Sequence, residues 1–341
     1  MLKKYAGYST IACLLIGSLA SCGGASTESE TKTEVVGQEE ELHNPASLEV
    51  PKEAEGLVGR WDLTVDKGEK KAPSWLEIKV SGYNTLVGAF VSEAGSSRPV
   101  SHIVLKEGKF SFAIPPQWEG GEGDFKIDGE LAGSDLKGTI TSNKGETFNF
   151  TGVKAPYLNR TGDAEWGTPV VLFNGTDLKG WKPSSDENNK WIVKDGILIN
   201  TEAGANLISE QTYEDFKLTA EFRYAEGGNA GIYLRGRYEV QIEDSPKDRH
   251  PGSLYFGGVY GFLSPNQLAT NGPGEWNTYE ITLRGRLVTI VANGKTIISE
   301  QEIPGITGGA LDSNEGEPGP IYLQGDHTGV EFRKLVITPA K

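Results

Sequence analysis

Residues 238–243 read Tyr-Glu-Val-Gln-Ile-Glu, with an apolar side chain at every second position and a polar one between each pair. Because successive side chains of a β-strand point to opposite faces, the pattern predicts a strand that buries Val240 and Ile242 and turns its polar side chains to the other face. The same alternation recurs at 76–80 and 110–114, and no stretch shows a convincing 3.6-residue period. The sequence therefore predicts an all-β protein.

Two regions carry this strand pattern. Residues 57–155 consist of short strand-like stretches between glycine and polar turns, which predicts a small antiparallel β-barrel or sandwich. Residues 168–341 hold about ten further stretches, two of them joined by Asn-Gly at 293–294, which predicts a jelly-roll sandwich of two sheets. Residues 156–167 contain Pro, Asn-Arg and Gly-Asp pairs with little apolar periodicity, so we expect a linker there and separate folding on either side.

The first region has three tryptophans whose location is informative. Trp61, Trp75 and Trp118 could line a ligand cavity, but buried aromatic residues more often form core. We expect core packing for all three and no catalytic group in this region.

The N-terminus has the parts of a secretory signal. Two lysines precede the apolar run 11–19, which is too short to span a bilayer as a mature helix. Residues 19–22, Leu-Ala-Ser-Cys, resemble a bacterial lipobox, so residues 1–21 are predicted to be removed and Cys22 to be acylated. The alternative is ordinary cleavage that leaves Cys22 as a free thiol, which is disfavoured because the mature chain has no second cysteine to pair with it.

Composition limits the location and the partners. Residues 22–56 are rich in Ser, Thr and Glu, which predicts an acidic disordered tether to a membrane at the periplasmic or outer-membrane surface. The formal net charge of −14 becomes −16 when Lys3 and Lys4 are lost with the signal. This charge repels phosphate groups, so nucleic acid is excluded as a partner and a neutral ligand is favoured. The sequence points to no protein partner.

Six short segments of the second region occur in the order found in one bacterial domain family. They are Leu-Phe-Asn-Gly-Thr-Asp-Leu-Lys-Gly-Trp at 172–181, Trp-Ile-Val-Lys-Asp-Gly at 191–196, Asn-Ala-Gly-Ile-Tyr-Leu-Arg at 229–235, Tyr-Glu-Val-Gln-Ile-Glu-Asp at 238–244, Gly-Glu-Trp-Asn at 274–277 and Gly-Pro-Ile-Tyr-Leu-Gln at 319–324. By these segments, residues 168–338 resemble the family named for 3-keto-glucoside 1,2-lyase and 3-keto-2-hydroxyglucal hydratase activity, also called 3-keto-disaccharide hydrolases. The resemblance implies a concanavalin A-like fold.

The resemblance also implies a chemistry. When a sugar carries a carbonyl group at its third carbon, the proton on the second carbon becomes acidic, and a base can remove it while the glycosidic oxygen leaves the first carbon. Hydration of the product runs these steps in reverse. The protein must supply a base, a donor or metal for the developing enolate, and an acid for the leaving group, but no covalent nucleophile.

Three residues are the catalytic candidates. Glu239 is expected to act as base or metal ligand, His327 as acid or base, and Arg235 as donor to the carbonyl oxygen. His250 is the second choice to His327, because Gly325 looks like an extra residue that leaves the placing of His327 open. The residues expected to bind substrate are Asn229, Gln241, Glu243, Asp244 and Asp326. Asp326 or Glu331 is expected to orient His327.

Alternatives remain for the metal and for the activity. A divalent metal is possible, either with Glu239 or at the acidic loop 312–316, and no organic cofactor is implied. The same fold serves lectins, so a non-catalytic carbohydrate-binding protein is the main alternative. A conventional glycoside hydrolase that uses Glu239 and Glu243 is the weaker one, because Gln241 stands where glucanases of this fold have Asp.

Overall fold

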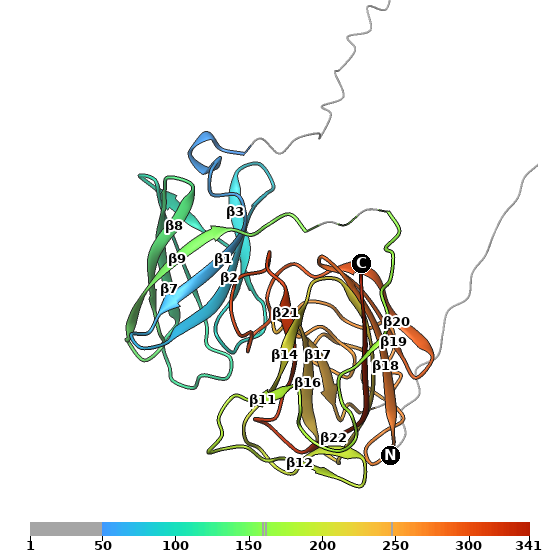
Figure 1. Cartoon of the computed structure of the whole chain (residues 1–341). Coiled ribbons are helices and arrows are strands. Elements are labelled where there is room, and N and C mark those ends of the chain that lie inside the picture. Colours follow the sequence, from blue (N-terminus) through green and yellow to red (C-terminus); the bar gives the residue numbers. More distant parts are fainter. Residues whose placement is uncertain (1–49, 159, 161, 247) are drawn as a thin grey trace, which may run out of the picture. The chain divides into compact units, whose positions relative to one another are not determined.

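The computed structural model describes residues 50–158, 160, 162–246 and 248–341, all within one compact unit (Figure 1). Within these residues the single helical element is a short 3-10 turn, η1 (Lys52–Ala54), and the rest consists of strands and their connections. The all-β prediction is confirmed. The signal sequence and Cys22 lie outside the described residues, as does the predicted tether up to residue 49. Ala54, near the end of that predicted tether, is fully buried in the hydrophobic core enclosed by the first nine strands.

The first nine strands form one antiparallel sheet in the order β4-β3-β2-β1-β9-β8-β7-β6-β5. Strands β4 and β6 also come close together, so the sheet curls towards a barrel (Figure 1). Its interior holds a core around Trp61, whose indole N–H donates to the Leu57 carbonyl (2.8 Å). The strands are β1 (Gly59–Asp66), β2 (Lys71–Ser81), β3 (Thr85–Val91), β4 (Arg98–Val100), β5 (Val104–Lys106), β6 (Lys109–Ile114), β7 (Phe125–Ala132), β8 (Asp135–Thr141) and β9 (Thr147–Lys154).

The remaining strands form two antiparallel sheets, as predicted for a sandwich. The larger has the order β12-β13-β22-β15-β18-β19-β20, with β10 paired to β22. Its strands are β10 (Val170–Val171), β12 (Trp191–Lys194), β13 (Ile197–Asn200), β15 (Phe216–Tyr224), β18 (Asn277–Arg284), β19 (Leu287–Ala292), β20 (Lys295–Glu302) and β22 (Val330–Pro339). The smaller has the order β11-β14-β21-β16-β17, formed by β11 (Trp181–Pro183), β14 (Leu207–Tyr213), β16 (Asn229–Leu234), β17 (Tyr238–Glu243) and β21 (Gly319–Leu323).

Local sequence accounts for the features that set the register. Val240 and Ile242 of β17 are completely buried in the sandwich core, as their alternation predicts. Between β19 and β20, Asn293 and Gly294 both have positive φ (49° and 76°), which a two-residue hairpin turn of type I′ requires.

Trp75 joins the nine-stranded sheet to the sandwich. It is fully buried, but its side chain belongs to the core of residues 173–337, where its ring meets Phe262 edge-on at a centroid distance of 5.3 Å. Nearby, the Ser313 hydroxyl donates to the Leu63 carbonyl. The core prediction is thus confirmed for Trp61 and Trp75, although Trp75 packs into the neighbouring core.

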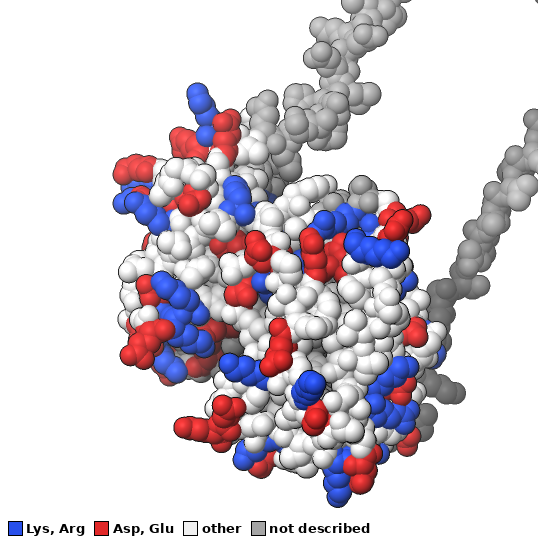
Figure 2. Space-filling model, in the orientation of Figure 1, with Lys and Arg blue, Asp and Glu red and all other residues white. Residues whose placement is uncertain are grey.

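The surface carries both signs of charge. Figure 2 shows Lys and Arg side chains interspersed with Asp and Glu side chains on the face in view. Ion pairs at the surface include that of Arg333 with Glu221 (2.7 Å). Among the described residues, no helix is long and apolar enough to cross a bilayer.

We predict that fragments 57–155 and 168–341 each unfold cooperatively when expressed alone, but at lower temperatures than the intact chain. Separation exposes Trp75 on one fragment and Phe262 on the other, and burying a large aromatic side chain contributes about 2–3 kcal/mol. Circular dichroism melts of both fragments and the whole chain measure this. If fragment 168–341 shows no cooperative transition, the nine-stranded sheet is part of its core and separate folding is wrong.

Candidate functional site

A cleft of about 640 Å³ lies over the smaller sheet of the sandwich. Strands β16, β17 and β21 place their polar side chains there in rows, because residues that pair across strands share a face. Tyr233 pairs with Glu239 on one side and with Tyr322 on the other. Asn229 pairs with Glu243 in a second row. The predicted alternation along β17 is confirmed, since the cleft receives all three of its polar side chains.

Glu239 is the buried acid of this cleft. Its side chain is 2% exposed, and its Oε2 accepts a hydrogen bond from the Tyr233 hydroxyl (2.9 Å). Its Oε1 has no hydrogen-bond partner among the described residues. Burial raises the pKa of Glu239 to about 8, against a smaller lowering by the Tyr233 hydrogen bond and the charge of His327. A carboxyl group with such a pKa can take up or release a proton near neutral pH.

A glycine makes room for this carboxyl group. Gly231 lies on β16 beside Glu239, and a Cβ at this position would collide with the carboxylate and its Cγ. The backbone of Glu239 is also fixed, because its N–H donates to the Thr307 hydroxyl (3.0 Å) and its carbonyl accepts from Tyr260 N–H (3.0 Å).

His327 lines the same cleft from the segment after β21. Its Nδ1 is 2.6 Å from Oδ1 of Asp326, and this hydrogen bond raises the pKa of the imidazole. Glu239 raises that pKa further by its charge, so the two groups are close enough to interact electrostatically. The structure makes Asp326 the carboxylate beside His327, whereas Glu331 pairs with Arg223.

The extra glycine before this segment has a packing role. Gly325 lies against the Ala205 carbonyl, where a Cβ would collide, and its N–H donates to Asn206 Oδ1 (2.8 Å). These contacts fix the backbone at Gly325. His327, two residues later, therefore lies at the cleft although Gly325 is an extra residue in the segment.

The predicted substrate-binding residues divide into two groups. Asn229, Gln241, Glu243 and Asp326 line the cleft. Asp244 does not, because its carboxylate accepts from Gly227 N–H (2.9 Å) and stabilises the adjacent turn.

Arg235 is the predicted catalytic residue that the structure does not bring to the cleft. It follows β16 with a left-handed φ of 52° and is completely buried. Its guanidinium donates to the Tyr238 hydroxyl and to the Gly285 carbonyl, both at 2.9 Å. Tyr238 precedes Glu239 on β17, so its side chain points to the opposite face of the sheet. The contact with Tyr238 therefore places Arg235 on the core side, away from Glu239.

Aromatic side chains that the sequence did not single out complete the cleft. Tyr233 stacks on Tyr322 with ring centroids 4.3 Å apart, and Tyr255 and Tyr260 also line the cleft. Trp118, predicted to be core, is instead 68% exposed and lines the cleft, so that prediction is wrong. A lone tryptophan in the Pro-, Gly- and Glu-rich stretch 115–123 is the signal that could have identified it.

The acidic loop 312–316, one of the two places considered for a divalent metal, has carboxylates that pair with arginines. Asp312 Oδ1 accepts from Arg237 (2.7 Å), and Glu315 is completely buried in an ion pair with Arg286 (2.5 Å). No group of three or more His, Cys, Asp or Glu side chains suited to a metal occurs among the described residues.

The spacing along β17 bears on the glycosidase alternative. Glu239 and Glu243 line the cleft from the same face of the strand, with Gln241 between them. Glycosidases of the carboxylate type need two correctly spaced carboxyl groups, and the residue between these two is an amide where glucanases of this fold have a carboxylate. The Glu243 carboxylate is moreover held by the Ser245 hydroxyl (2.6 Å), beyond Gln241.

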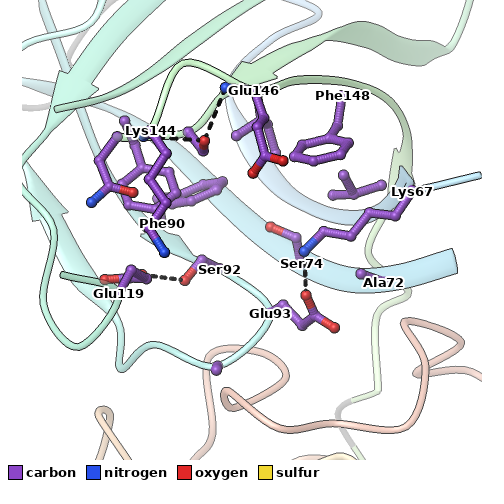
Figure 3. Close-up of a pocket in the computed structure, with 16 residues that line it drawn as sticks. Lys67, Ala72, Ser74, Phe90, Ser92, Glu93, Glu119, Lys144, Glu146 and Phe148 are labelled. Carbon is purple, nitrogen blue, oxygen red and sulfur yellow. Dashed lines mark hydrogen bonds and ion pairs between the residues drawn. The ribbon is translucent and has the colours of Figure 1, made fainter. Parts of the chain in front are cut away.

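A second cavity, of about 250 Å³, opens in the nine-stranded sheet (Figure 3). Lys67 and Glu93 pair with each other at its edge, and apolar side chains such as Phe90 and Phe148 form part of its wall. It contains no histidine or cysteine, in contrast to the cleft with Glu239 and His327.

Comparisons with known proteins concern the sandwich. Residues 168–338 match the family described as 3-keto-alpha-glucoside-1,2-lyase-like domains. A 3-keto-disaccharide hydrolase of Bacteroides thetaiotaomicron is 28% identical over 86 residues, which are 22% of this chain and 29% of that protein. The chain thus spans less than a third of the length of this curated relative.

Two crystal structures from Parabacteroides distasonis, both provisionally named glycosyl hydrolases, are also similar. One is 26% identical with a TM-score of 0.42, covering 53% of this chain and 93% of its own. The other is 20% identical with a TM-score of 0.41, covering 51% of this chain and 94% of its own.

We predict that Glu239→Gln stabilises the protein at pH 8 but not at pH 4. The folded state keeps a proton on Glu239 up to about pH 8, whereas the unfolded chain releases it near the ordinary value of 4.5. The wild-type protein therefore loses stability as pH rises between these values, by roughly 4 kcal/mol, and an amide does not. Thermal melts of both proteins across this range measure the difference. A glutamine variant that melts below the wild type at pH 8 contradicts it.

Proposed function

The chain belongs, through residues 168–338, to the family of 3-keto-alpha-glucoside-1,2-lyase-like domains, and on this premise we propose that it cleaves or hydrates 3-keto-glycosides. One observation carries the proposal: the buried carboxyl group of Glu239, with a free Oε1, shares a cleft with the Asp326–His327 pair. A base and an acid of suitable pKa are thus available to one ligand.

Glu239 acts as the base in this proposal. Its Oε1 takes the proton from the second carbon of the sugar, while Tyr233 holds Oε2 by its hydroxyl. The C–H electron pair becomes a carbon–carbon double bond and the bond to the glycosidic oxygen breaks. A base works best when its pKa lies near the operating pH, and burial brings that of Glu239 into this range.

His327 acts as the acid. Its Nδ1 is occupied by Asp326, so Nε2 is the atom that gives a proton to the departing oxygen. Addition of water across the double bond then reverses the two proton transfers. The net reaction is hydrolysis when elimination and hydration follow each other.

Tyr260 takes the donor role that Arg235 does not reach. Its hydroxyl accepts from the Trp118 indole (3.1 Å), which leaves its own proton for the carbonyl oxygen of the ligand. Burial raises the pKa of Tyr260, and the negative charge of Glu239 does so further, so the hydroxyl stays protonated. A neutral donor of this kind stabilises a developing enolate.

Carbohydrate binding without catalysis is the second candidate. The exposed face of Trp118 at the cleft supports it, because lectin sites combine an aromatic platform with hydrogen-bonding groups. Gln241, which stands where glucanases of this fold have a carboxylate, makes a conventional glycoside hydrolase the weakest candidate.

We predict turnover of a 3-keto-glucoside and essentially none of the unoxidised glucoside. Glu239→Gln should lower kcat at least ~100-fold, and His327→Ala by a comparable factor, as for other general acid–base groups. Product release assayed by chromatography measures this, with Tyr83→Ala, an exposed aromatic outside the cleft, as the control. Equal hydrolysis of both substrates would favour the glycosidase, and tight binding without turnover would favour the lectin.

We further propose that the protein is a lipoprotein held at the periplasmic or outer-membrane surface, on the basis of the Leu-Ala-Ser-Cys sequence at 19–22. Mass spectrometry of the mature N-terminus should find acyl chains on Cys22, and Cys22→Ala should move the protein from the detergent to the aqueous phase. Stable anchoring needs more than one chain, so a multiply acylated cysteine is expected. A wild-type protein without lipid refutes the proposal.

A further inference from the structure

Trp118 comes from outside the sandwich that forms most of the cleft. It lies between β6 and β7 of the nine-stranded sheet, beyond the segment 168–338 that matches the family. Trp61 and Trp75 of that sheet are fully buried, whereas Trp118 is 68% exposed. An aromatic side chain this exposed, beside a cleft with polar groups, is a common element of ligand recognition.

Hydrogen bonds hold the segment that carries Trp118. The Glu119 Oε2 accepts from the backbone N–H of Gln117 (2.7 Å) and of Trp118 (3.1 Å), and its Oε1 accepts from the Ser92 hydroxyl (3.3 Å; Figure 3). The Gln117 side chain makes two bonds to Ser96, at 3.0 and 2.7 Å. The indole is therefore positioned before a ligand arrives.

Tyr260 sets the separation between Trp118 and Glu239. Its backbone N–H donates to the Glu239 carbonyl (3.0 Å), and its hydroxyl accepts from the Trp118 indole N–H (3.1 Å). One tyrosine side chain thus lies between the backbone of the acid and the indole. Because the indole N–H is already bonded, the ring face is what remains for a ligand.

We infer that Trp118 forms a subsite for the second ring of the substrate, the one beyond the glycosidic bond that is broken at Glu239. The inference rests on the proposed function. The apolar face of a sugar ring packs on the indole, while the first ring lies among the polar groups of β16 and β17. The substrate class is then glycosides with a ring on both sides of the bond, and the nine-stranded sheet selects them.

Calorimetric binding to the mature chain carrying Glu239→Gln tests this without turnover. The ligands are a 3-keto-disaccharide and the methyl 3-keto-glucoside, which lacks the second ring. Trp118→Ala should weaken disaccharide binding about tenfold or more, corresponding to the loss of one aromatic face, and weaken methyl glucoside binding much less, because that ligand is affected only through the lost bond between Trp118 and Tyr260. Trp118→Phe should recover part of the loss, and Tyr83→Ala, which removes an exposed aromatic side chain from the turn between β2 and β3, should have no effect.

The outcomes separate the subsite from the proposed function. Equal loss for both ligands, or no loss for either, overturns the subsite, as does a parent protein that does not bind the disaccharide. Turnover by the wild-type protein, which keeps Glu239, is measured separately, and its absence refutes the catalytic proposal. A loss of affinity on Trp118→Ala that is specific to the disaccharide supports the subsite even then.

Discussion

Burying the carboxyl group of Glu239 costs free energy, since a charge is poorly solvated away from water, and the structure reduces this cost only in part. One oxygen has the Tyr233 hydroxyl as a partner and the other has none among the described residues. Gly231 provides the space, and the β17 backbone is bonded on both sides. The unliganded site therefore keeps part of this desolvation cost. It favours a ligand that donates a hydrogen bond to Oε1 of Glu239 or transfers a proton to it.

The nine-stranded sheet contributes to this site through its own packing. Trp75 is inserted in the sandwich core, and Asp62 of β1 lies beside the buried Glu315–Arg286 pair. Burial, together with the negative charge of Glu315, raises the pKa of Asp62, so a neutral carboxyl group lies beside the Glu315–Arg286 ion pair. These contacts fix the strands whose loops reach the cleft. The position of the Trp118 side chain at the cleft therefore depends on residues that do not themselves contact a ligand.

The sequence predicted what depends on local alternation and missed what depends on tertiary contacts. The period of two along residues 238–243 places Glu239, Gln241 and Glu243 on one face, and the structure confirms that face. Arg235 was assigned from its nearness in the chain, but a left-handed turn after β16 sends it to the other side. Trp118 was assigned to a core from its size alone. Its true position follows from Glu119 and Tyr260, and the latter is 142 residues away, so no local pattern encodes it.

There is a physical reason why the sandwich supplies the proton-transfer groups and the nine-stranded sheet supplies the aromatic surface. The sandwich strands hold the groups that exchange protons, and these require fixed, partly buried positions to keep a shifted pKa. Recognition of a second ring needs only an exposed flat surface at a set distance, which a loop can supply when its backbone is bonded as at Glu119. Because that loop lies outside residues 168–338, its sequence can change without disturbing Glu239 or His327. Related sandwiches with a different preceding domain would then share the proton-transfer groups and differ in the ring they accept.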